Sequence, residues 1–293
     1  MSRVLVVGDL ITDVVVVPDG EIEAGTDTLA AITPSGGGQG ANTAAWLAHA
    51  GAPVTLIASV GDDAAGRDRV AELTGAGVNC AVRAHPSART GTVVVLATPH
   101  ERTLITDPGA CLLLGPADVR AAVVAADDPV HLHLSGYVLL NEGCRQAGRA
   151  ALAAARERGL TMSVDASSAA PLRRTPSFPD WIRGADLLLA NADEATVLAG
   201  PGTPAEQAVR LTAHARNVVV KLGAKGAVWA GPDGEVVTLP PPSPVVVAEP
   251  TGAGDAFAAG LLRSWCTGAS PAEALSAGAA LGAAAVTKVG ARP

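Results

Sequence analysis

The stretch EPTGAGDAF at 249–257 places two glycines and a lone carboxylate directly before a run of small residues. Gly252 and Gly254 would let the backbone turn sharply. A helix beginning near Asp255 would point its unpaired N–H groups into that turn, where they could hold an anion. Asp255 would repel a bound phosphate, but it suits a hydroxyl whose proton it removes while the oxygen attacks phosphorus. In isolation, a glycine turn followed by a helix-capping Asp is the more common explanation.

A second glycine-rich stretch, SGGGQGAN at 35–42, precedes a helical pattern and holds four glycines within five positions. The backbone there must pass close to another group or take several positive φ values. The spacing partly imitates the dinucleotide fingerprint G-x-G-x-x-A, which belongs in the turn after a core strand. Because Pro34 and a small sheet precede it instead, an NAD-dependent oxidoreductase is a remote alternative. Asn42 is placed either to bind a polyhydroxyl ligand or to cap the helix.

The third stretch, LLLANADE at 187–194, ends an apolar run and places Asn191 three residues before Glu194. Strand ends at the carboxyl edge of a parallel sheet are where ligands bind. An amide and a carboxylate there suit a hydrated Mg²⁺, which prefers oxygen ligands and keeps several waters. The same pair fits a capping box, with Asn191 as the N-cap and Glu194 at the third helical position, and the two roles are compatible.

The elements that must position these stretches follow from the apolar pattern. Continuous β-branched runs are typical of strands buried on both faces of a parallel sheet. They occur at RVLVVGD, VTLIASVG, VHLHLSG, LTMSVDAS, DLLLAN and NVVVKLG. Ala-rich segments of helical character lie between them, at 40–50, 64–75, 143–158 and 204–215. This alternation predicts an α/β fold with a mainly parallel sheet and crossover helices.

Two regions interrupt the alternation. Residues 11–35 and 88–107 contain strand patterns punctuated by Gly and Pro, with no helical pattern to cover them. We expect the two regions to form one small β-sheet that lies over the main domain as a lid. The main α/β domain, which would bind nucleotide and substrate, then comprises 1–10, 36–87 and 108–293.

Composition limits the partners. The formal net charge is −7 and aromatic residues make up 2% of the chain, which argues against nucleic-acid binding. No stretch approaches the roughly 20 apolar residues of a membrane span, and no cleavage pattern follows the apolar N-terminus. The four cysteines are widely spaced without a C-x-x-C pair, which argues against a zinc site and a disulfide framework. We therefore expect a cytoplasmic protein with no membrane partner.

Three other side chains attract attention. His131 and His133 share one face of a predicted strand, but no third metal ligand accompanies them, so packing or hydrogen bonding is their expected role. Arg102 lies in the predicted lid. It is placed either to reach a substrate when the lid closes or to remain a solvated charge.

Taken together, GGGQGAN and PTGAGDAFAAG, with NADE between them, resemble the signatures of the ribokinase-like (phosphofructokinase-B) family of carbohydrate kinases. The resemblance covers nearly the whole chain. It implies a three-layer α/β/α fold with a central, mainly parallel sheet and a small β-sheet lid. It also implies transfer of the γ-phosphoryl group of ATP, with Mg²⁺, to a hydroxyl of a sugar or sugar-like molecule.

The resemblance implies roles for individual residues. Asp255 matches the catalytic base, and the backbone of Gly252, Ala253 and Gly254 matches the anion hole. The implied acceptor site consists of Asp13, Gly38, Gln39 and Asn42, with Arg102 from the lid. The implied nucleotide contacts are Asn191, Lys221, Gly223, Thr251 and Gly278, and Asn191 with Glu194 would organise Mg²⁺.

Some positions depart from ribokinase itself. This chain has Ile11-Thr12-Asp13 at the position of the N-A-D motif of ribokinase. It has Gln39 at the position of the Lys in the ribokinase motif GGKGAN. No carboxylate stands near Gly136, where ribose-binding members carry a Glu. The lost amide and ammonium remove donors that a furanose hydroxyl would use, so ribose is not the expected acceptor.

The resemblance leaves several alternatives. Glu249-Pro250 stands where potassium-activated relatives have Asp-Thr, which leaves K⁺ activation open. A nucleoside kinase of the same family would need a wall for the base, and the predicted lid holds no aromatic residue. A non-catalytic sensor would not need Asp255. Apolar lid strands such as TVVVLAT favour a homodimer that pairs the two lids.

Overall fold

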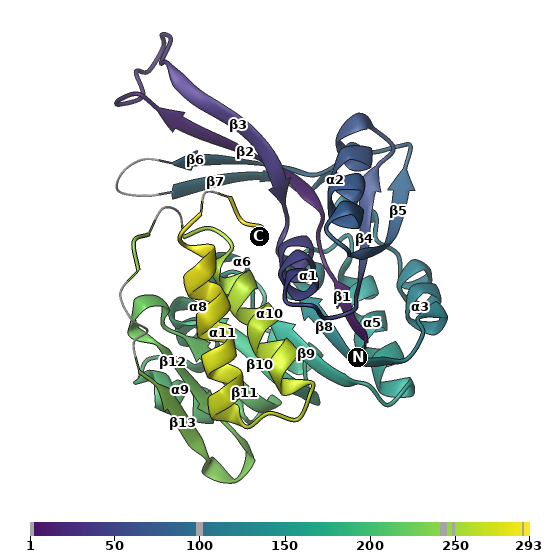
Figure 1. Ribbon diagram of the computed structural model, residues 1–293, viewed down its shortest axis with the longest axis vertical. Coiled ribbons are helices and arrows are strands. Elements are labelled where there is room, and N and C mark those ends of the chain that lie inside the picture. Colours follow the sequence, from purple (N-terminus) through teal and green to yellow (C-terminus); the bar gives the residue numbers. More distant parts are fainter. Residues whose placement is uncertain (1–2, 98–101, 241–244, 248–249, 289) are drawn as a thin grey trace.

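The computed structural model describes residues 3–97, 102–240, 245–247, 250–288 and 290–293. Within these residues, a nine-stranded sheet lies between two layers of helices, and a four-stranded sheet projects from it (Figure 1). The strand order of the large sheet is β13-β12-β11-β10-β9-β8-β1-β4-β5. The strands are β1 (Arg3–Val7), β4 (Val54–Gly61), β5 (Asn79–His85), β8 (Pro129–Ser135), β9 (Thr161–Asp165), β10 (Ala185–Asn191), β11 (Ala215–Lys221), β12 (Ala227–Ala230) and β13 (Val236–Leu239).

The large sheet is parallel from β5 to β11 and ends in an antiparallel pair, β12 and β13. Because the seven parallel strands run the same way, their carboxyl ends meet at one edge. The polar residues Ser135, Asp165, Asn191 and Lys221 each end one of these strands. This edge is where an α/β sheet binds its ligands.

Helices cover both faces of the large sheet and bury two aliphatic cores. One face carries α1 (Gln39–His49), α2 (Ala64–Gly75), α10 (Ala253–Trp265) and α11 (Pro271–Ala285). The other carries α3 (Pro116–Ala125), α5 (Arg145–Glu157), α8 (Ala192–Ala199) and α9 (Pro204–Leu211). Three short α-helices, α4 (Tyr137–Leu140), α6 (Ala169–Arg173) and α7 (Phe178–Trp181), and three 3-10 helices at Gly109–Leu113, Gly223–Lys225 and Pro232–Gly234 complete the helices of the described residues. With so few aromatic residues, Ala, Val and Leu fill most of this core.

The small sheet has the order β3-β2-β6-β7. It consists of β2 (Ile11–Pro18), β3 (Ala30–Gly37), β6 (Thr92–Ala97) and β7 (Arg102–Asp107). β2 and β6 are parallel neighbours although they lie far apart in the sequence, so the two interrupting regions do form one sheet. Its only buried aliphatic cluster in the described chain is Ile11, Val93 and Val95.

The predicted α/β fold with a small additional sheet is confirmed, and all six predicted core strands are present. The structure adds β5, β12 and β13, which the sequence analysis did not predict. The predicted helix 204–215 was too long, because α9 ends at Leu211 and β11 begins at Ala215. Among the described residues, no helix combines the length and the apolar character that a membrane crossing needs.

Candidate active site

The glycine turn at 250–254 leads directly into α10. Gly252 is the N-cap of the helix, with a φ of +77° in the left-handed region that favours glycine. A Cβ on Gly252 would lie 2.4 Å from the carbonyl oxygen of Ala291, so the position also has no room for a side chain. Helix α10 begins at Ala253, which leaves the N–H groups of its first turn without intrahelical partners. This is the geometry that an anion hole requires.

Asp255 does not cap this helix. The N-cap has no side-chain hydrogen bond, and the Asp255 carboxylate instead accepts a hydrogen bond of 3.0 Å from Nδ2 of Asn42. Asn42 does not cap α1 either, because the N-cap there is Gly38 and it too receives no side-chain hydrogen bond. The simpler explanation of both residues as helix caps is therefore wrong. The two glycine-rich stretches meet at the Asn42–Asp255 hydrogen bond.

The surroundings of Asp255 favour its protonated form. Burial raises the pKa of Asp255 to about 8, the hydrogen bond from Asn42 opposes this rise, and the negative charge of Asp165 adds to it. The positive charge of Lys221 acts in the lowering direction. A carboxyl group whose pKa lies near neutrality is suited to take up a proton during a reaction.

A cavity of about 720 Å³ lies beside the glycine turn. Lys221 and Gly254 line the end of the cavity next to the turn, and Gly223 also lines it. The rest of the lining is mostly apolar: Ala224, Gly226, Val245, Val247, Pro250, Ala253, Phe257, Ala279, Gly282, Ala283 and Val286. An apolar cavity that ends at an anion-binding turn has the shape and chemistry that a nucleotide needs.

Three residues assigned to the nucleotide do not line this cavity: Asn191, Thr251 and Gly278. Gly278 packs α11 against α10, where a Cβ would lie 2.9 Å from the carbonyl oxygen of Phe257. The cavity is lined instead by Ala279 and Gly282, from the same helix. Thr251 lies within the glycine turn, directly before the N-cap.

Lys221 forms a buried ion pair with Asp165, with 2.6 Å between Nζ and Oδ2. The two side chains are 14% and 3% exposed. Burial by itself lowers the pKa of Lys221, but the charges of Asp165 and Glu194 raise it above its ordinary value, so the amine stays protonated. A Cβ on Gly254 would lie 3.6 Å from Nζ, so this ammonium reaches the glycine turn and can attract a phosphate there.

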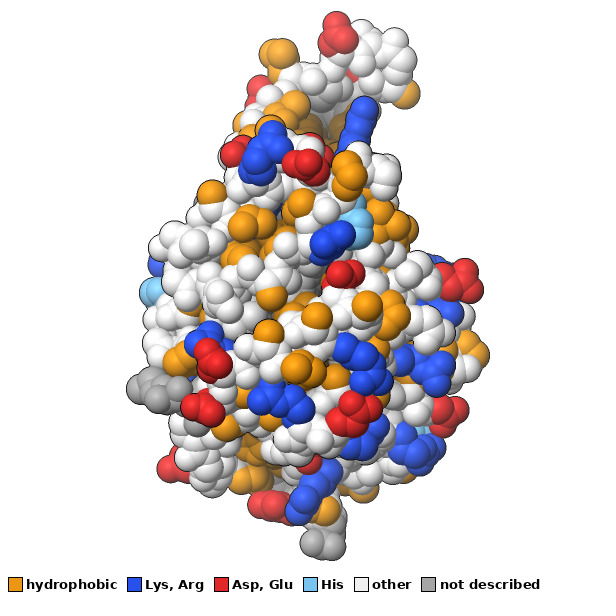
Figure 2. Space-filling model, turned by 90° about the vertical axis from the view of Figure 1, so that its right-hand side faces the viewer, with side chains coloured by type: hydrophobic (Ala, Val, Ile, Leu, Met, Phe, Trp, Pro, Cys, Tyr) orange, Lys and Arg blue, Asp and Glu red, His pale blue; other side chains and the backbone are white. Residues whose placement is uncertain are grey.

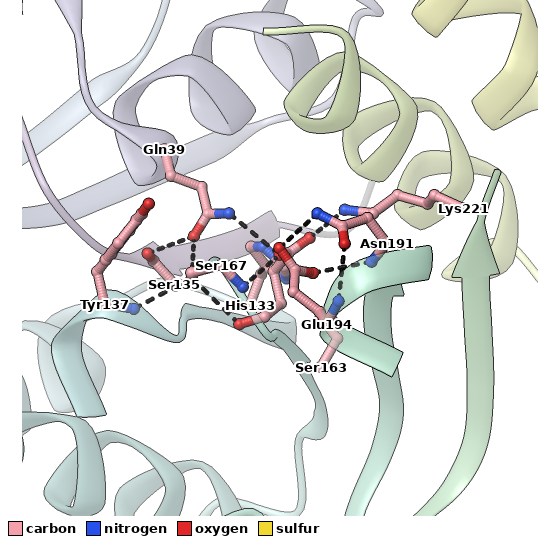
Figure 3. A network of polar contacts seen from close by, with 10 residues as sticks. Gln39, His133, Ser135, Tyr137, Ser163, Ser167, Asn191, Glu194 and Lys221 are labelled. Atoms are coloured by element: carbon pink, nitrogen blue, oxygen red, sulfur yellow. Dashed lines mark hydrogen bonds and ion pairs between the residues drawn. The ribbon is translucent and has the colours of Figure 1, made fainter. Parts of the chain in front are cut away.

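Gln39 links the start of α1 to the ends of β8 and β9 (Figure 3). Its Nε2 donates to Oδ1 of Asp165 at 3.1 Å, and its Oε1 accepts hydrogen bonds from Ser135 at 2.6 Å and Ser167 at 2.5 Å. Ser167 has a φ of +71°, a strained value for a residue with a side chain. Both lone pairs of the Gln39 amide oxygen are engaged, which leaves one N–H for a substrate.

Asp9 follows β1 and fixes the start of α1. Its carboxylate accepts hydrogen bonds from the backbone N–H groups of Gln39 at 2.9 Å and Gly40 at 3.2 Å. Gly38 has a φ of +101°, and a Cβ there would lie 2.5 Å from the carbonyl oxygen of Asp9. The glycines of the second stretch are thus needed for close backbone contact with the end of β1.

Asn191 and Glu194 form the capping box of α8. Oδ1 of Asn191 accepts from the Glu194 N–H at 2.9 Å, and the Glu194 carboxylate accepts from Asn191 N and Nδ2 at 2.8 and 2.6 Å. Burial and the charge of Asp165 raise the pKa of Glu194 to about 7, although the charge of Lys221 lowers it. The capping interpretation is confirmed. Glu194 is 2% exposed, so the pair would act on a hydrated cation through water rather than as a cage.

The remaining acceptor residues lie at the base of the small sheet. Asp13 is 9% exposed in β2, and its carboxylate approaches Gly37, where a Cβ would lie 2.2 Å from the carboxyl carbon. The backbone of Arg102 begins β7, but its side chain lies outside the described residues. Glu249, on which the K⁺ prediction depends, is also outside them. The K⁺ prediction stays a prediction.

The two histidines have the structural role that was expected. Both rings contact Oγ of Ser163 at 2.7 Å, and Nδ1 of His131 lies 2.8 Å from Oγ1 of Thr161. Burial lowers the pKa of His131 to about 3 and that of His133 to about 4, so both rings are neutral. The described part of the chain holds no cluster of three His, Cys, Asp or Glu that could bind a metal ion.

Several site residues escaped the sequence analysis. Asp9, Ser135 and Asp165 all stand at the carboxyl ends of parallel strands, and the same position in β10 is what drew attention to Asn191. A polar residue at the carboxyl end of a predicted parallel strand is therefore the signal that could have identified all three. Arg292, whose side chain reaches Asn42, gave no comparable signal.

Comparisons with known proteins identify the family of the chain. The model of the pfkB family carbohydrate kinases matches residues 1–293. An ATP-dependent ribose-1-phosphate kinase from Halopiger xanaduensis is 33% identical, with 100% of this chain and 94% of that protein covered.

An adenosine kinase from Sinorhizobium meliloti superposes with a TM-score of 0.90 at 24% identity, covering 100% of this chain and 96% of that one. An E. coli structure described as ribokinase II in complex with ATP and Mg²⁺ has a TM-score of 0.86 at 23% identity, covering 99% and 94%. The chain belongs to the pfkB family of carbohydrate kinases, which are phosphotransferases with an alcohol group as acceptor.

Proposed function

We propose that this kinase transfers the γ-phosphoryl group of ATP to a hydroxyl of a sugar or sugar-like molecule, with Asp255 as the general base. The observation that carries the proposal is the Asn42–Asp255 hydrogen bond of 3.0 Å at the first turn of α10. Asp255 follows the cavity-lining Ala253 and Gly254 and contacts Asn42 of α1, which supports a position between nucleotide and acceptor. From there Asp255 can take the proton of a hydroxyl that attacks in line with the leaving group.

The glycine turn supplies the complementary half of the chemistry. The backbone N–H groups at the start of α10 and the ammonium of Lys221 would lie where charge develops on the transferring phosphoryl group, although the Ala253 N–H already donates to the Pro250 carbonyl at 3.3 Å. Donors that are already fixed need no reorganisation during the reaction, which is the basis of electrostatic stabilisation. The buried partner of Lys221, Asp165, holds the ammonium in place.

The oxygen-rich end of β10 fits Mg²⁺ held mainly by nucleotide phosphates and water, with Asn191 and Glu194 as the protein side of the site. When bound, Mg²⁺ would neutralise charge on the phosphates. Asn191, the exposed member of the pair, would contact the water shell, while the buried Glu194 would orient Asn191 through the hydrogen bond to its amide.

For the acceptor, we propose a sugar or sugar phosphate other than free ribose. The similar Halopiger protein is named for ribose 1-phosphate. In this chain, most of the hydrogen-bonding capacity of the Gln39 amide is used by Asp165, Ser135 and Ser167, so little of it remains for a ribose hydroxyl. Asp13, Gly38 and Asn42 would then contact the acceptor. The small sheet would act as a lid, and Arg102 would reach the acceptor from it. A nucleoside acceptor is the rival, since an adenosine kinase shares the fold.

The base assignment predicts the effect of Asp255→Asn. A catalytic carboxyl must be deprotonated to act, and the pKa of Asp255 is raised to about 8, so kcat/KM should rise with pH up to about that value. Asp255→Asn should lower kcat by about 10² to 10⁴ and remove this acidic limb. Near-normal turnover of the Asn variant would refute the mechanism.

The acceptor should be identified first by thermal shift. Sugars, sugar phosphates, sugar acids and nucleosides are screened with a non-hydrolysable ATP analogue and Mg²⁺, because a ligand of the native state raises Tm. Asp255→Asn should keep the shift caused by the true acceptor while losing turnover. Stabilisation by nucleosides alone would favour the rival acceptor class.

We further propose a cytoplasmic homodimer that pairs the small sheets. Their outward face carries Ile32 and Ile105, which are 63% and 61% exposed, beside the half-buried Val14, Val94 and Leu96. Hydrophobic side chains are visible on this projecting part of the molecule (Figure 2). Contiguous exposed apolar surface of this kind commonly marks a protein interface.

A further inference from the structure

The last residues of the chain return to the active site. Nε1 of Trp46 in α1 donates to the carbonyl oxygen of Ala291 at 3.0 Å, and Ala291 is 4% exposed. The same carbonyl lies against Gly252, at the distance that leaves no room for a Cβ there. The C-terminal segment is therefore fixed between α1 and the glycine turn (Figure 1).

Arg292 uses this position to make three contacts. Its Nε donates to Oδ1 of Asn42 at 3.1 Å, and its Nη2 donates to the carbonyl oxygen of Gly37 at 2.9 Å. Its Nη1 forms an ion pair of 2.8 Å with Glu72 on α2. The Arg292 side chain is 10% exposed. A partly buried guanidinium with all three nitrogens engaged holds one geometry, because its planar donors are fixed relative to each other.

The contact with Asn42 determines what that side chain presents to Asp255. An amide has a carbonyl oxygen that only accepts and a nitrogen that only donates. With Oδ1 against the guanidinium, Nδ2 faces the Asp255 carboxylate. The reversed amide would place N–H groups against N–H groups on one side and oxygen against carboxylate on the other. Arg292 therefore excludes the orientation in which Asp255 loses its donor.

We propose that Arg292 is a positioning residue, which holds the Asn42 amide so that its N–H is presented to the Asp255 carboxylate. The kinetic part of this inference rests on the proposed function of Asp255 as the base. The geometric part does not, since it concerns only the free protein. Arg292 touches neither reacting group, so its effect passes through Asn42.

The charged surroundings allow the effect to be isolated. Asp255 faces Asp165, Lys221 and Asp9, each on a different strand end, and Tyr137 lies near enough to be influenced by its charge. Arg292 faces a separate set, which consists of Glu72, Arg69 and Asp13. The two sets share no member among these groups. Arg292 and Asp255 do bond to the same amide, so the test must separate the hydrogen bond through Asn42 from a direct effect of the guanidinium charge.

The test measures the pKa of the Asp255 carboxyl by ¹³C NMR titration of the free protein, with the signal assigned from its loss in Asp255→Asn. Removal of Arg292 frees the Asn42 amide, so the hydrogen bond that lowers the pKa of Asp255 weakens. Arg292→Ala should therefore raise this pKa by about one unit, the size expected for a lost hydrogen bond to a charged group. Asn42→Ala should raise it similarly.

The double variant separates positioning from simple charge removal. In the Asn42→Ala background, Arg292→Ala should cause no further rise, because the route is already broken. A rise of equal size in that background would show that Arg292 acts by its charge, and would overturn the proposal. So would an unchanged pKa in the single variant.

Two further variants guard against a loss of fold. Glu72→Ala leaves Arg292 in place but removes its anchor outside the site, and should raise the pKa in the same direction by less. Arg120→Ala removes an exposed ion pair with Glu157 and should leave the pKa unchanged. Thermal melts confirm that each variant is folded before titration.

Kinetics with the acceptor found by the screen complete the test. Arg292→Ala should lower kcat about tenfold, move the acidic limb of kcat/KM to higher pH, and leave the KM for ATP nearly unchanged. If Asp255→Asn keeps its turnover while the NMR shift is found, the base assignment fails and the positioning stands. If Asp255→Asn is inactive and no NMR shift is found, the reverse holds.

Discussion

The carboxyl edge of the large sheet and the small sheet are built in opposite ways. At the edge, the single residue Asp165 accepts three hydrogen bonds, from Gln39, Ser167 and Lys221. Among its described residues, the small sheet buries a single aliphatic cluster and leaves Leu104 and Ile105 more than 60% exposed. One region is fixed by many polar contacts, and the other has few contacts that would hold it against the main domain.

This difference suits the two regions to different steps, phosphoryl transfer at the edge of the large sheet and acceptor binding at the small sheet. Phosphoryl transfer needs donors and a base whose positions do not change, and such groups are best held by rigid elements. Acceptor binding needs a surface that admits and then covers the substrate, which suits a region with little buried area. We therefore expect substitutions at the edge to affect kcat and substitutions on the outer face of the small sheet to affect assembly.

The largest effect is expected at the glycine turn. Gly252→Ala introduces a Cβ at a φ of +77°, 2.4 Å from the oxygen of Ala291, so the turn must shift. Displacing the N–H donors should lower kcat by about 10² to 10³. The matched control is Gly268→Ala, because Gly268 has a φ of +88° but no heavy atom within 4 Å of its Cβ position.

Both glycine variants should lose some stability, since each forces an L-residue into the left-handed region. Only Gly252→Ala should lose turnover. Steady-state kinetics and thermal melts on the two proteins check this. Equal losses of kcat would mean that general strain, and not the position of the N–H groups, explains the result.

The same contrast explains what the sequence made predictable. Six strands of the large sheet and the three motif stretches were predictable because their signals are local: continuous β-branched runs, clustered glycines and an amide three residues before a carboxylate. The Lys221–Asp165 ion pair was not, since β9 and β11 flank β10 only in the folded sheet and strand order is not written in a local pattern.

Long-range contacts of the chain end were harder still. Arg292 lies 250 residues from Asn42, and nothing about a single arginine near a C-terminus indicates a partner. The helix-capping interpretation of Asp255 failed for a related reason. The helix start depends on how Gly252 packs against Ala291, which places Asp255 inside the first turn instead of at its cap.

An intermediate effect is expected for Gln39→Ala. The substitution removes the hydrogen bond to the buried Asp165. It also leaves the hydroxyls of Ser135 and Ser167 with only their longer contacts of 3.3 Å, to the Asp9 carboxylate and to the Asp165 carbonyl oxygen. The start of α1, which carries Asn42, should then be less well positioned, so kcat/KM for the acceptor should fall about tenfold. Kinetics at varied acceptor and ATP concentrations measure this.

The control for Gln39 is Gln207→Ala. Gln207 is 4% exposed. Its Nε2 donates to Thr196 within α8 and to Gly200 at the C-cap of that helix, whereas Asn191 is the N-cap. Both variants should lose about 1 to 3 kcal/mol of stability through unpaired buried groups. A fall in kcat/KM for Gln207→Ala as large as that for Gln39→Ala would attribute the effect to stability alone.

The smallest effect on catalysis is expected for Ile105→Asp on the outer face of the small sheet. A charge at this 61% exposed position should break the pairing of two small sheets, because burying an unpaired carboxylate at an interface is costly. Light scattering should show a dimer for the unsubstituted chain and a monomer for Ile105→Asp, with kcat within about twofold. Val124→Asp, at a 73% exposed position on α3, is the control and should remain dimeric. A monomeric unsubstituted chain would show that the outer face has another role, while a large loss of kcat in Ile105→Asp would show that the two regions are less independent than their packing suggests.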